Sequence, residues 1–168
     1  LTNDSPRQGG TRDGGQIPGV HGILGSMKWT LISGATSGIG LATAELLASR
    51  KHNLILLGRR ADRLQKIQKD LKSQHAIQCE VFDFDLRSKK QMAGFLTSQA
   101  PLLKNVRVLI NNAGLARGVD LLQDSSLEDI DEMIDTNVTA LLHLTRGVLP
   151  FLLEAQEGHV VNIGSVAG

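Results

Sequence analysis

Short apolar segments recur along the chain and are separated by stretches with helical periodicity. Four of them are nearly continuous in apolar residues: 29–33 (WTLIS), 53–58 (NLILLG), 106–110 (VRVLI) and 159–163 (HVVNI). A fifth, 77–82 (IQCEVF), is more mixed. Continuous apolar runs of this length are typical of parallel strands that are covered on both faces. We therefore predict five strands at these positions.

Between these segments, apolar residues recur at a spacing of three or four. Such spacing places their side chains on one face of a helix. Two helices are predicted in this way, one carrying Leu64, Ile67 and Leu71 and the other carrying Met92, Phe95 and Leu96.

A longer helix is predicted to follow Ser125, because Ser125 and Glu128 form an S-x-x-E capping box. Pro150 lacks a backbone N–H and is expected to kink or end a segment of this helix. The apolar stripe of the helix is expected to comprise Leu127, Ile130, Met133, Ile134, Leu141, Leu142 and Leu149.

Strand and helix alternate without hairpin signals, and this order predicts right-handed βαβ units. The expected fold class is α/β, a Rossmann-type doubly wound parallel sheet with five strands in this chain. At 168 residues, the chain is long enough to form one domain with a sizeable core.

Residues 1–26 do not follow this pattern. They are rich in Gly, Asp, Asn and Pro and have no periodicity, so they bury too little apolar surface to offset the cost of ordering. Gly25 and Ser26 stand directly before Met27, as at a cloning junction ahead of a natural start. This favours a vector-derived leader, with a native disordered tail as the alternative. The folded domain is expected to comprise residues 27–168.

Composition excludes several classes of partner. The 18 Lys and Arg residues balance the 17 Asp and Glu residues, and no basic run is present, so neither nucleic acid nor an anionic membrane is expected to bind. The single cysteine, Cys79, excludes an intrachain disulfide and indicates a reducing, cytoplasmic location. The five histidines have no metal-ligand spacing, and we expect no metal site.

The first predicted strand runs directly into the glycine-rich sequence SGATSGIG. At a turn from strand to helix, one glycine permits the turn, a second lets the backbone approach a pyrophosphate, and a third lets the helix pack closely. The N-terminus of the following helix would direct its N–H groups at the phosphates. The alternative is a tight turn that binds nothing. The predicted cofactor contacts are Gly34, Ser37, Gly38, Ile39 and Gly40.

The end of the second strand indicates the type of cofactor. A free ribose 2′-hydroxyl is usually held by an acidic residue about 20 residues after the glycine loop. Here the strand ends with Gly58, Arg59 and Arg60. A guanidinium forms charge-assisted bonds to a 2′-phosphate, which predicts NADP rather than NAD, with Arg59 as the preferred contact. The alternative is a pair of solvated arginines at the start of a helix.

Further motifs stand in a recognisable order after the glycine loop. Asp85-Leu86 follows the third strand, NNAG (111–114) follows the fourth, Asn137 lies in DTNVTA on the long helix, and Ser165 follows the fifth strand in NIGSVAG. With these motifs, residues 28–168 resemble the classical short-chain dehydrogenase/reductase family. The resemblance implies that Asp85 approaches the adenine amine. It also implies cofactor contacts for Leu86, Asn111, Ala113 and Gly114.

The resemblance also implies catalytic roles for Ser165 and Asn137. The hydroxyl of Ser165 would polarise a substrate carbonyl, and Asn137 would organise a water relay. A surface or back-bonded asparagine is the alternative for Asn137. In the family, the proton comes from a tyrosine in a Y-x-x-x-K motif, and this sequence contains no tyrosine. We therefore expect the chain to be C-terminally truncated, to lack the later strands, and to have no turnover.

Within the family, GRRADRLQ, NNAGLARG, MIDTN, TRGVLP and VVNIGS are similar to the NADP-dependent 3-hydroxy acid (serine) dehydrogenases. The expected function is that of an NADP-dependent oxidoreductase acting on a small hydroxy or carbonyl substrate. A reductase for another carbonyl and a non-catalytic NADP-binding or interaction module are the alternatives. The resemblance also implies that the parent enzyme is a homodimer or homotetramer.

Overall fold

The computed structural model describes residues 28–117 and 121–164 and contains one parallel sheet of five strands. The sheet has the order β3-β2-β1-β4-β5, which confirms the predicted Rossmann-type architecture. The proposed leader at 1–26 and Ser165 lie outside the described residues. The strands are β1 (Trp29–Ser33), β2 (Asn53–Gly58), β3 (Cys79–Asp83), β4 (Val106–Asn111) and β5 (His159–Asn162).

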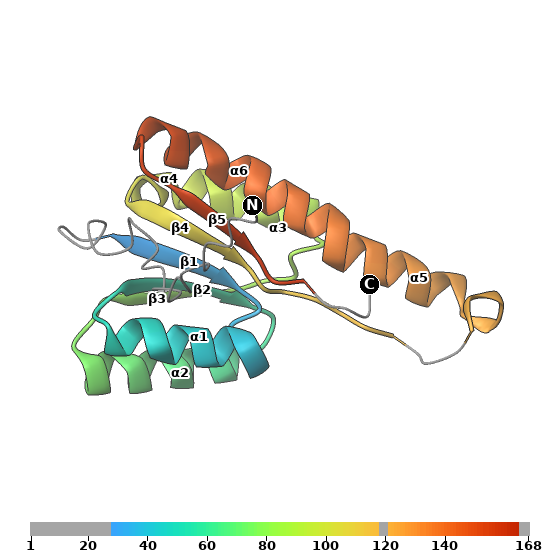
Figure 1. Ribbon diagram of the computed structural model, residues 1–168, viewed down its shortest axis with the longest axis horizontal. Helices are drawn as coiled ribbons and strands as arrows, with labels where there is room; N and C mark the ends of the chain where they lie inside the picture. Colours follow the sequence, from blue (N-terminus) through green and yellow to red (C-terminus); the bar gives the residue numbers. More distant parts are fainter. Residues whose placement is uncertain (1–27, 118–120, 165–168) are drawn as a thin grey trace, which may run out of the picture.

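Helices lie on both faces of the sheet. Figure 1 shows α1 (Gly38–Ser49) and α2 (Ala61–His75) on one face and α3 (Lys89–Ser98) and α6 (Leu141–Glu154) on the other. In the described residues, no helix is long and apolar enough to cross a membrane. The remaining helical segments are α4 (Ala100–Leu103), the 3₁₀ turn η1 (Leu122–Asp124), α5 (Leu127–Ile134) and the π-helical segment η2 (Asp135–Ala140).

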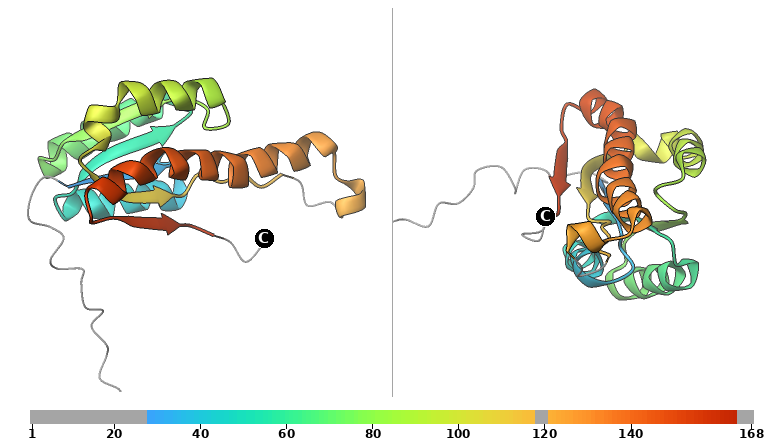
Figure 2. Two further views of the ribbon diagram at one scale, coloured as in Figure 1. Left: turned by 90° about the horizontal axis from the view of Figure 1, so that it is seen from above. Right: turned by 90° about the vertical axis from the view of Figure 1, so that its right-hand side faces the viewer.

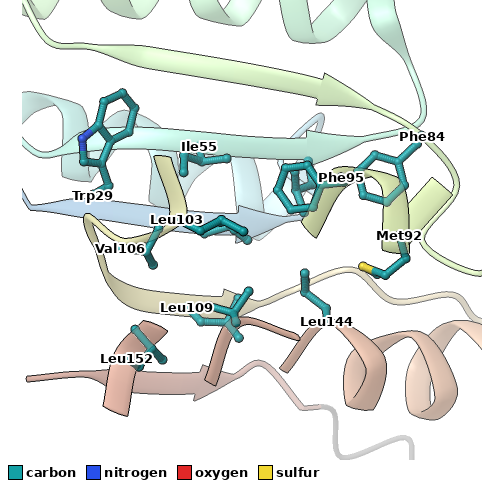
Figure 3. Close-up of a cluster of buried hydrophobic side chains, with 13 residues drawn as sticks. Trp29, Ile55, Phe84, Met92, Phe95, Leu103, Val106, Leu109, Leu144 and Leu152 are labelled. Atoms are coloured by element: carbon teal, nitrogen blue, oxygen red, sulfur yellow. The ribbon is translucent and has the colours of Figure 1, made fainter. Parts of the chain in front are cut away.

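The central strands supply both halves of the core, because successive side chains point to opposite faces. Leu31, Ile55, Leu57 and Leu109 pack with Met92, Phe95, Leu144 and Val148 on the face covered by α3 and α6 (Figure 3). On the other face, Ile32, Leu54, Leu56 and Ile110 pack with Ala44, Ala48, Leu64 and Leu71 of α1 and α2. The nearly continuous apolar runs predicted this two-sided burial.

The long helix differs from the prediction in the face that it buries. Helices α5, η2 and α6 follow one another along a continuous axis (Figure 2). The predicted stripe was wrong at four positions, which are exposed, whereas its other three residues are half-buried. The exposed positions are Leu127, Ile134, Leu142 and Leu149, and the half-buried ones are Ile130, Met133 and Leu141. The face that packs against the sheet instead carries Ala140, Leu144, Val148 and Leu152, at a spacing of four.

Three local predictions also need correction. The N-cap of α5 is Ser126, whose Oγ accepts a hydrogen bond from the Asp129 N–H at 3.1 Å. The Ser125 hydroxyl instead donates to the Leu121 carbonyl at 3.2 Å. Of the two effects expected of Pro150, a kink or an end, the end does not occur: the helix continues to Glu154, and Val148 and Leu152 on either side of the proline are buried in the core. Strand β3 begins at Cys79, two residues later than predicted.

Candidate active site

The carboxyl ends of the strands open into a cleft of about 940 Å³, which we call the nucleotide cleft. A second groove, of about 620 Å³, is lined mainly by side chains of α1 and α2. Ligands of doubly wound sheets bind at the carboxyl ends of the strands, so the nucleotide cleft is the candidate active site. Among the predicted site residues, those that line it are Gly34, Ser37, Ile39, Arg59, Asp85, Leu86, Ala113, Gly114 and Asn137.

The three glycines at the junction of β1 and α1 are needed for different structural reasons. Gly34 has a φ of +68°, and a Cβ there would lie 2.7 Å from the Ala113 Cα. Gly38 has a φ of +56°, but a Cβ there would meet nothing within 4 Å. A Cβ at Gly40 would lie 2.5 Å from the Gly34 oxygen. Gly34 and Gly40 therefore permit close packing, whereas Gly38 permits the backbone turn into α1.

Hydrogen bonds join the glycine loop to the segment after β4. The Ser33 hydroxyl accepts from the backbone N–H groups of Asn112 and Ala113, both at 3.0 Å. The side-chain amide of Asn112 donates to the Ser33 and Gly34 carbonyls, both at 3.1 Å. The two walls of the cleft are therefore held together by the end of β1. Asn112 was not among the predicted site residues, although it belongs to NNAG.

The arginines after β2 lie beside this loop. The Arg60 guanidinium donates to the Thr36 hydroxyl through Nη2 at 2.7 Å and to the Ser37 hydroxyl at 2.9 Å. Arg59 lines the same cleft, and its positive charge helps to lower the pKa of Asp85. Both arginines thus lie at the β2 wall of the nucleotide cleft.

Asp85 forms an ion pair with Arg87 in the turn after β3. Arg87 Nε donates to Asp85 Oδ1 at 3.0 Å, and its Nη2 donates to Oδ2 at 2.6 Å. The same hydrogen bonds hold the pKa of the Asp85 carboxyl below its ordinary value. Asp85 is therefore a carboxylate with a fixed orientation. Arg87 was not predicted as a site residue.

Asn137 lies in the π-helical segment η2 and contacts the loop after β4. Its Nδ2 donates to the Leu115 carbonyl, and its Oδ1 accepts from the Leu115 N–H, both at 2.8 Å. Asn137 is exposed, as the surface alternative expects, but its amide is hydrogen-bonded to the loop rather than to its own helix. Segments with π geometry often occur at functional sites. Asn137 fixes the backbone of the loop that lines the cleft.

Asn111 is buried at the end of β4 and does not line the cleft. Gly38 and the buried Gly40, both in the first turn of α1, do not line it either. The Asn111 amide donates to the Thr145 hydroxyl of α6 and to Asn162 Oδ1 of β5, both at 2.8 Å. Its own Oδ1 is buried without a partner in the described part of the chain. Asn111 thus ties β4 to β5 and α6.

Strand β5 leads toward Ser165, which lies outside the described residues. The preceding residues Asn162, Ile163 and Gly164 line the nucleotide cleft. The Ile163 N–H donates to the Asn111 carbonyl at 2.9 Å, so pairing with β4 continues up to this point. Across residues 28–117 and 121–164, no three His, Cys, Asp or Glu side chains are grouped as metal ligands.

Comparison with known proteins agrees with the fold. The family model described as short chain dehydrogenase matches residues 28–168. An NADP-dependent 3-hydroxy acid dehydrogenase of Escherichia coli, YdfG, is 38% identical over 138 residues, which are 82% of this chain and 54% of that protein. The chain thus spans about half the length of the curated relatives that it matches.

Two solved structures extend the comparison. Serine dehydrogenase from Escherichia coli has a TM-score of 0.75 at 36% identity, over 83% of this chain and 62% of that chain. A short-chain dehydrogenase from Sphingobium yanoikuyae in complex with NADPH has a TM-score of 0.74 at 34% identity, over 83% and 54%. The chain belongs to the short-chain dehydrogenase family. Within it, the chain is similar to the NADP-dependent 3-hydroxy acid and serine dehydrogenases.

Proposed function

We propose that the chain is the nucleotide-binding part of an NADP-dependent oxidoreductase that acts on a small hydroxy or carbonyl substrate, such as a 3-hydroxy acid. The observation that carries this proposal is the placement of Arg59 and Arg60 at the cleft after β2, where NAD-binding proteins usually have an acidic residue. The names of the relatives, an NADP-dependent 3-hydroxy acid dehydrogenase and a serine dehydrogenase, support the same cofactor and substrate class.

The residues of the nucleotide cleft fit a dinucleotide phosphate. The open space beside Gly38, at the N-terminus of α1, leaves room for a phosphate group next to the N–H groups of the first helical turn. Arg59 and Arg60 would bind the 2′-phosphate, and the Asp85 carboxylate would accept from the adenine amine. When bound, the nicotinamide supplies the exchange of a hydride with the substrate carbon.

The proposed catalytic residues are Ser165 and Asn137. Ser165 follows Gly164 of the cleft wall, and its hydroxyl would polarise the substrate carbonyl. Asn137 would organise a water relay for the proton. The proton donor implied by the family is a tyrosine, and the sequence contains none, so we expect the 168-residue chain to bind the cofactor without turnover. The alternative is a non-catalytic NADP-binding or interaction module, which would need neither Asn137 nor Ser165.

Cofactor titration tests the proposal. We expect the chain to bind NADPH at least about tenfold more tightly than NADH, because charge-assisted bonds to the 2′-phosphate are strong. Arg59→Asp and Arg60→Gln should each reduce this preference, with the larger loss at Arg59. Arg63→Gln removes a positive charge from α2 in the other groove and is the matched control.

Equal binding of NADPH and NADH, or an unchanged preference in both arginine variants, would contradict the cofactor assignment. Measurable NADP-dependent oxidation of L-serine or 3-hydroxypropionate by the chain would refute its expected lack of turnover. It would also exclude the non-catalytic module.

We propose in addition that the parent enzyme is a cytoplasmic homo-oligomer. The exposed apolar side chains Leu142, Leu149 and Leu153 on α6 support self-association, because apolar patches of this kind mark interaction sites. The buried free Cys79 is compatible with a reducing compartment.

A further inference from the structure

Five charged side chains beside the nucleotide cleft form one connected set, which we call the Glu132 network. Its members are Asp85, Arg87, Arg117, Asp129 and Glu132. They come from three segments that are distant in the sequence: the turn after β3, the loop after β4 and helix α5. The network therefore links the three segments directly through their side chains.

Glu132 of α5 is the centre of the network. Its Oε1 accepts a hydrogen bond from Arg87 Nη1, and its Oε2 accepts from Arg117 Nε at 2.7 Å. Arg117 also lies 4.0 Å from Asp129, and its backbone N–H donates to the Met133 sulfur at 3.4 Å. The carboxylate therefore bridges two arginines that approach it from different loops.

Arg87 connects Glu132 to Asp85. The guanidinium uses Nε and Nη2 on Asp85 and Nη1 on Glu132, so each of its three nitrogens has an acceptor. The Arg87 backbone N–H also donates to Asp85 Oδ1 at 3.0 Å. Because a planar guanidinium and a carboxylate paired by two parallel bonds must be nearly coplanar, the orientation of Asp85 follows that of Arg87.

Isolated surface ion pairs contribute little to the stability of a protein. The Glu132 network differs from such pairs. The side chains of Arg87, Asp85 and Glu132 are 27%, 33% and 22% exposed, so they are shielded from much of the solvent. The pairing with Asp85 is bidentate, and the bonds are connected in series. Bidentate pairing and membership of a connected network are the two features that distinguish a geometry-fixing ion pair from an isolated surface pair.

We propose that Glu132 is a positioning residue for cofactor recognition: through Arg87, it holds the Asp85 carboxylate in the orientation that accepts a hydrogen bond from the adenine amine. An acceptor that is already oriented loses little freedom when the ligand binds. The inference rests on the proposed function, because the adenine contact of Asp85 is part of it. It adds that helix α5, which does not line the adenine contact itself, determines how well adenine is recognised.

The test compares two probes, NADPH and its hypoxanthine analogue, in which a carbonyl oxygen replaces the adenine amine. The measured quantity is the ratio of their dissociation constants. For the unmodified chain, the analogue should bind about tenfold more weakly, because its carbonyl oxygen cannot donate to the Asp85 carboxylate in place of the amine. In Glu132→Gln, which keeps the shape of the side chain, the ratio should fall toward one. A variant that merely loosened the fold would weaken both probes equally and leave the ratio unchanged.

Asp131→Asn is the matched control, because it removes a carboxylate from the neighbouring position of α5 that is not in the network. It should keep the ratio of the unmodified chain. Arg117→Gln changes an exposed side chain and is the second variant if Glu132→Gln does not fold; it should lower the ratio in the same direction. An unchanged ratio in the folded variants would overturn the inference alone. Failure of the unmodified chain to bind NADPH would overturn the proposed function as well.

Discussion

Gly40 shows how closely the first turn of α1 approaches the loop before it. A methyl group at this position would lie 2.3 Å from the Asn112 Nδ2 and 2.5 Å from the Gly34 oxygen. The Gly34 oxygen is part of the backbone, so the conflict cannot be relieved by rotating a side chain. Gly94, in the interior of α3, is the opposite case, since a methyl group there would meet nothing within 4 Å.

Gly40→Ala should therefore lower the free energy of unfolding by about 1–3 kcal/mol, because overpacking forces the backbone to move. Gly94→Ala, the matched control, should raise it by about 0.5–1 kcal/mol, because alanine loses less conformational freedom in a helix. Urea denaturation followed by the fluorescence of Trp29, the only tryptophan, measures both. Equal effects of the two substitutions would contradict the close approach of position 40 to the Gly34 oxygen.

The π-helical segment η2 acts at the scale of elements, because Asn137 links it to the loop after β4. The two hydrogen bonds to Leu115 satisfy both backbone groups of a residue that has no strand or helix partner. The contact is therefore a substitute for secondary structure in that loop.

Asn137→Ala should lower the free energy of unfolding by about 1–2 kcal/mol, because it leaves both backbone groups of Leu115 without these partners. It should also speed hydrogen exchange at the Leu115 amide. Val138→Ala, at an exposed neighbouring position, should change stability by no more than about 0.5 kcal/mol and leave that exchange rate unaltered. A slow Leu115 amide in Asn137→Ala would contradict this role.

The strands and their parallel, doubly wound arrangement were predictable from the sequence, because apolar runs buried on both faces leave a strong local signal. The glycine loop and the arginines after β2 were also found, since their position in the chain determines their place at the strand ends. The buried face of the long helix was not. Apolar residues occur on more than one face of this helix. Leu144 is buried and Leu142 is exposed, and the π-helical segment η2, which shifts the periodicity just before them, is not marked by any apolar repeat in the sequence.

The parts of the site that were missed are long-range contacts between loops. Asn112 could have been found, because it lies within the NNAG motif. The pairing of Arg87 with Glu132 spans 45 residues, and ordinary charged residues at both positions give no signal of it. Such contacts are specified by where the tertiary fold places α5 and the two loops rather than by local sequence.

At the scale of the whole molecule, the sheet separates two apolar clusters, and each contains a natural probe. Trp29 belongs to the cluster under α3 and α6, and Cys79 to the cluster under α1 and α2. Burial raises the pKa of the Cys79 thiol to about 12, so the thiol stays neutral and unreactive at pH 8 in the folded chain.

Labelling of Cys79 with a thiol reagent at pH 8 should therefore require unfolding. If both clusters unfold together, labelling and Trp29 fluorescence should have the same midpoint in urea. Cys79→Val should abolish labelling, because Cys79 is the only cysteine. Labelling at urea concentrations that leave the fluorescence unchanged would show that the α1–α2 layer opens independently.

The π-helical segment η2 has a rotational consequence for the helices on either side of it. A π turn holds one more residue per hydrogen-bonded ring than an α turn, and one residue corresponds to about 100° of rotation about the helix axis. If Asp135–Ala140 formed a regular α-helix with all of its residues kept, α5 would be turned by about that angle relative to α6. Glu132 would then point away from Arg87, although no residue of α5 had changed. The azimuth of α5 is thus encoded outside α5.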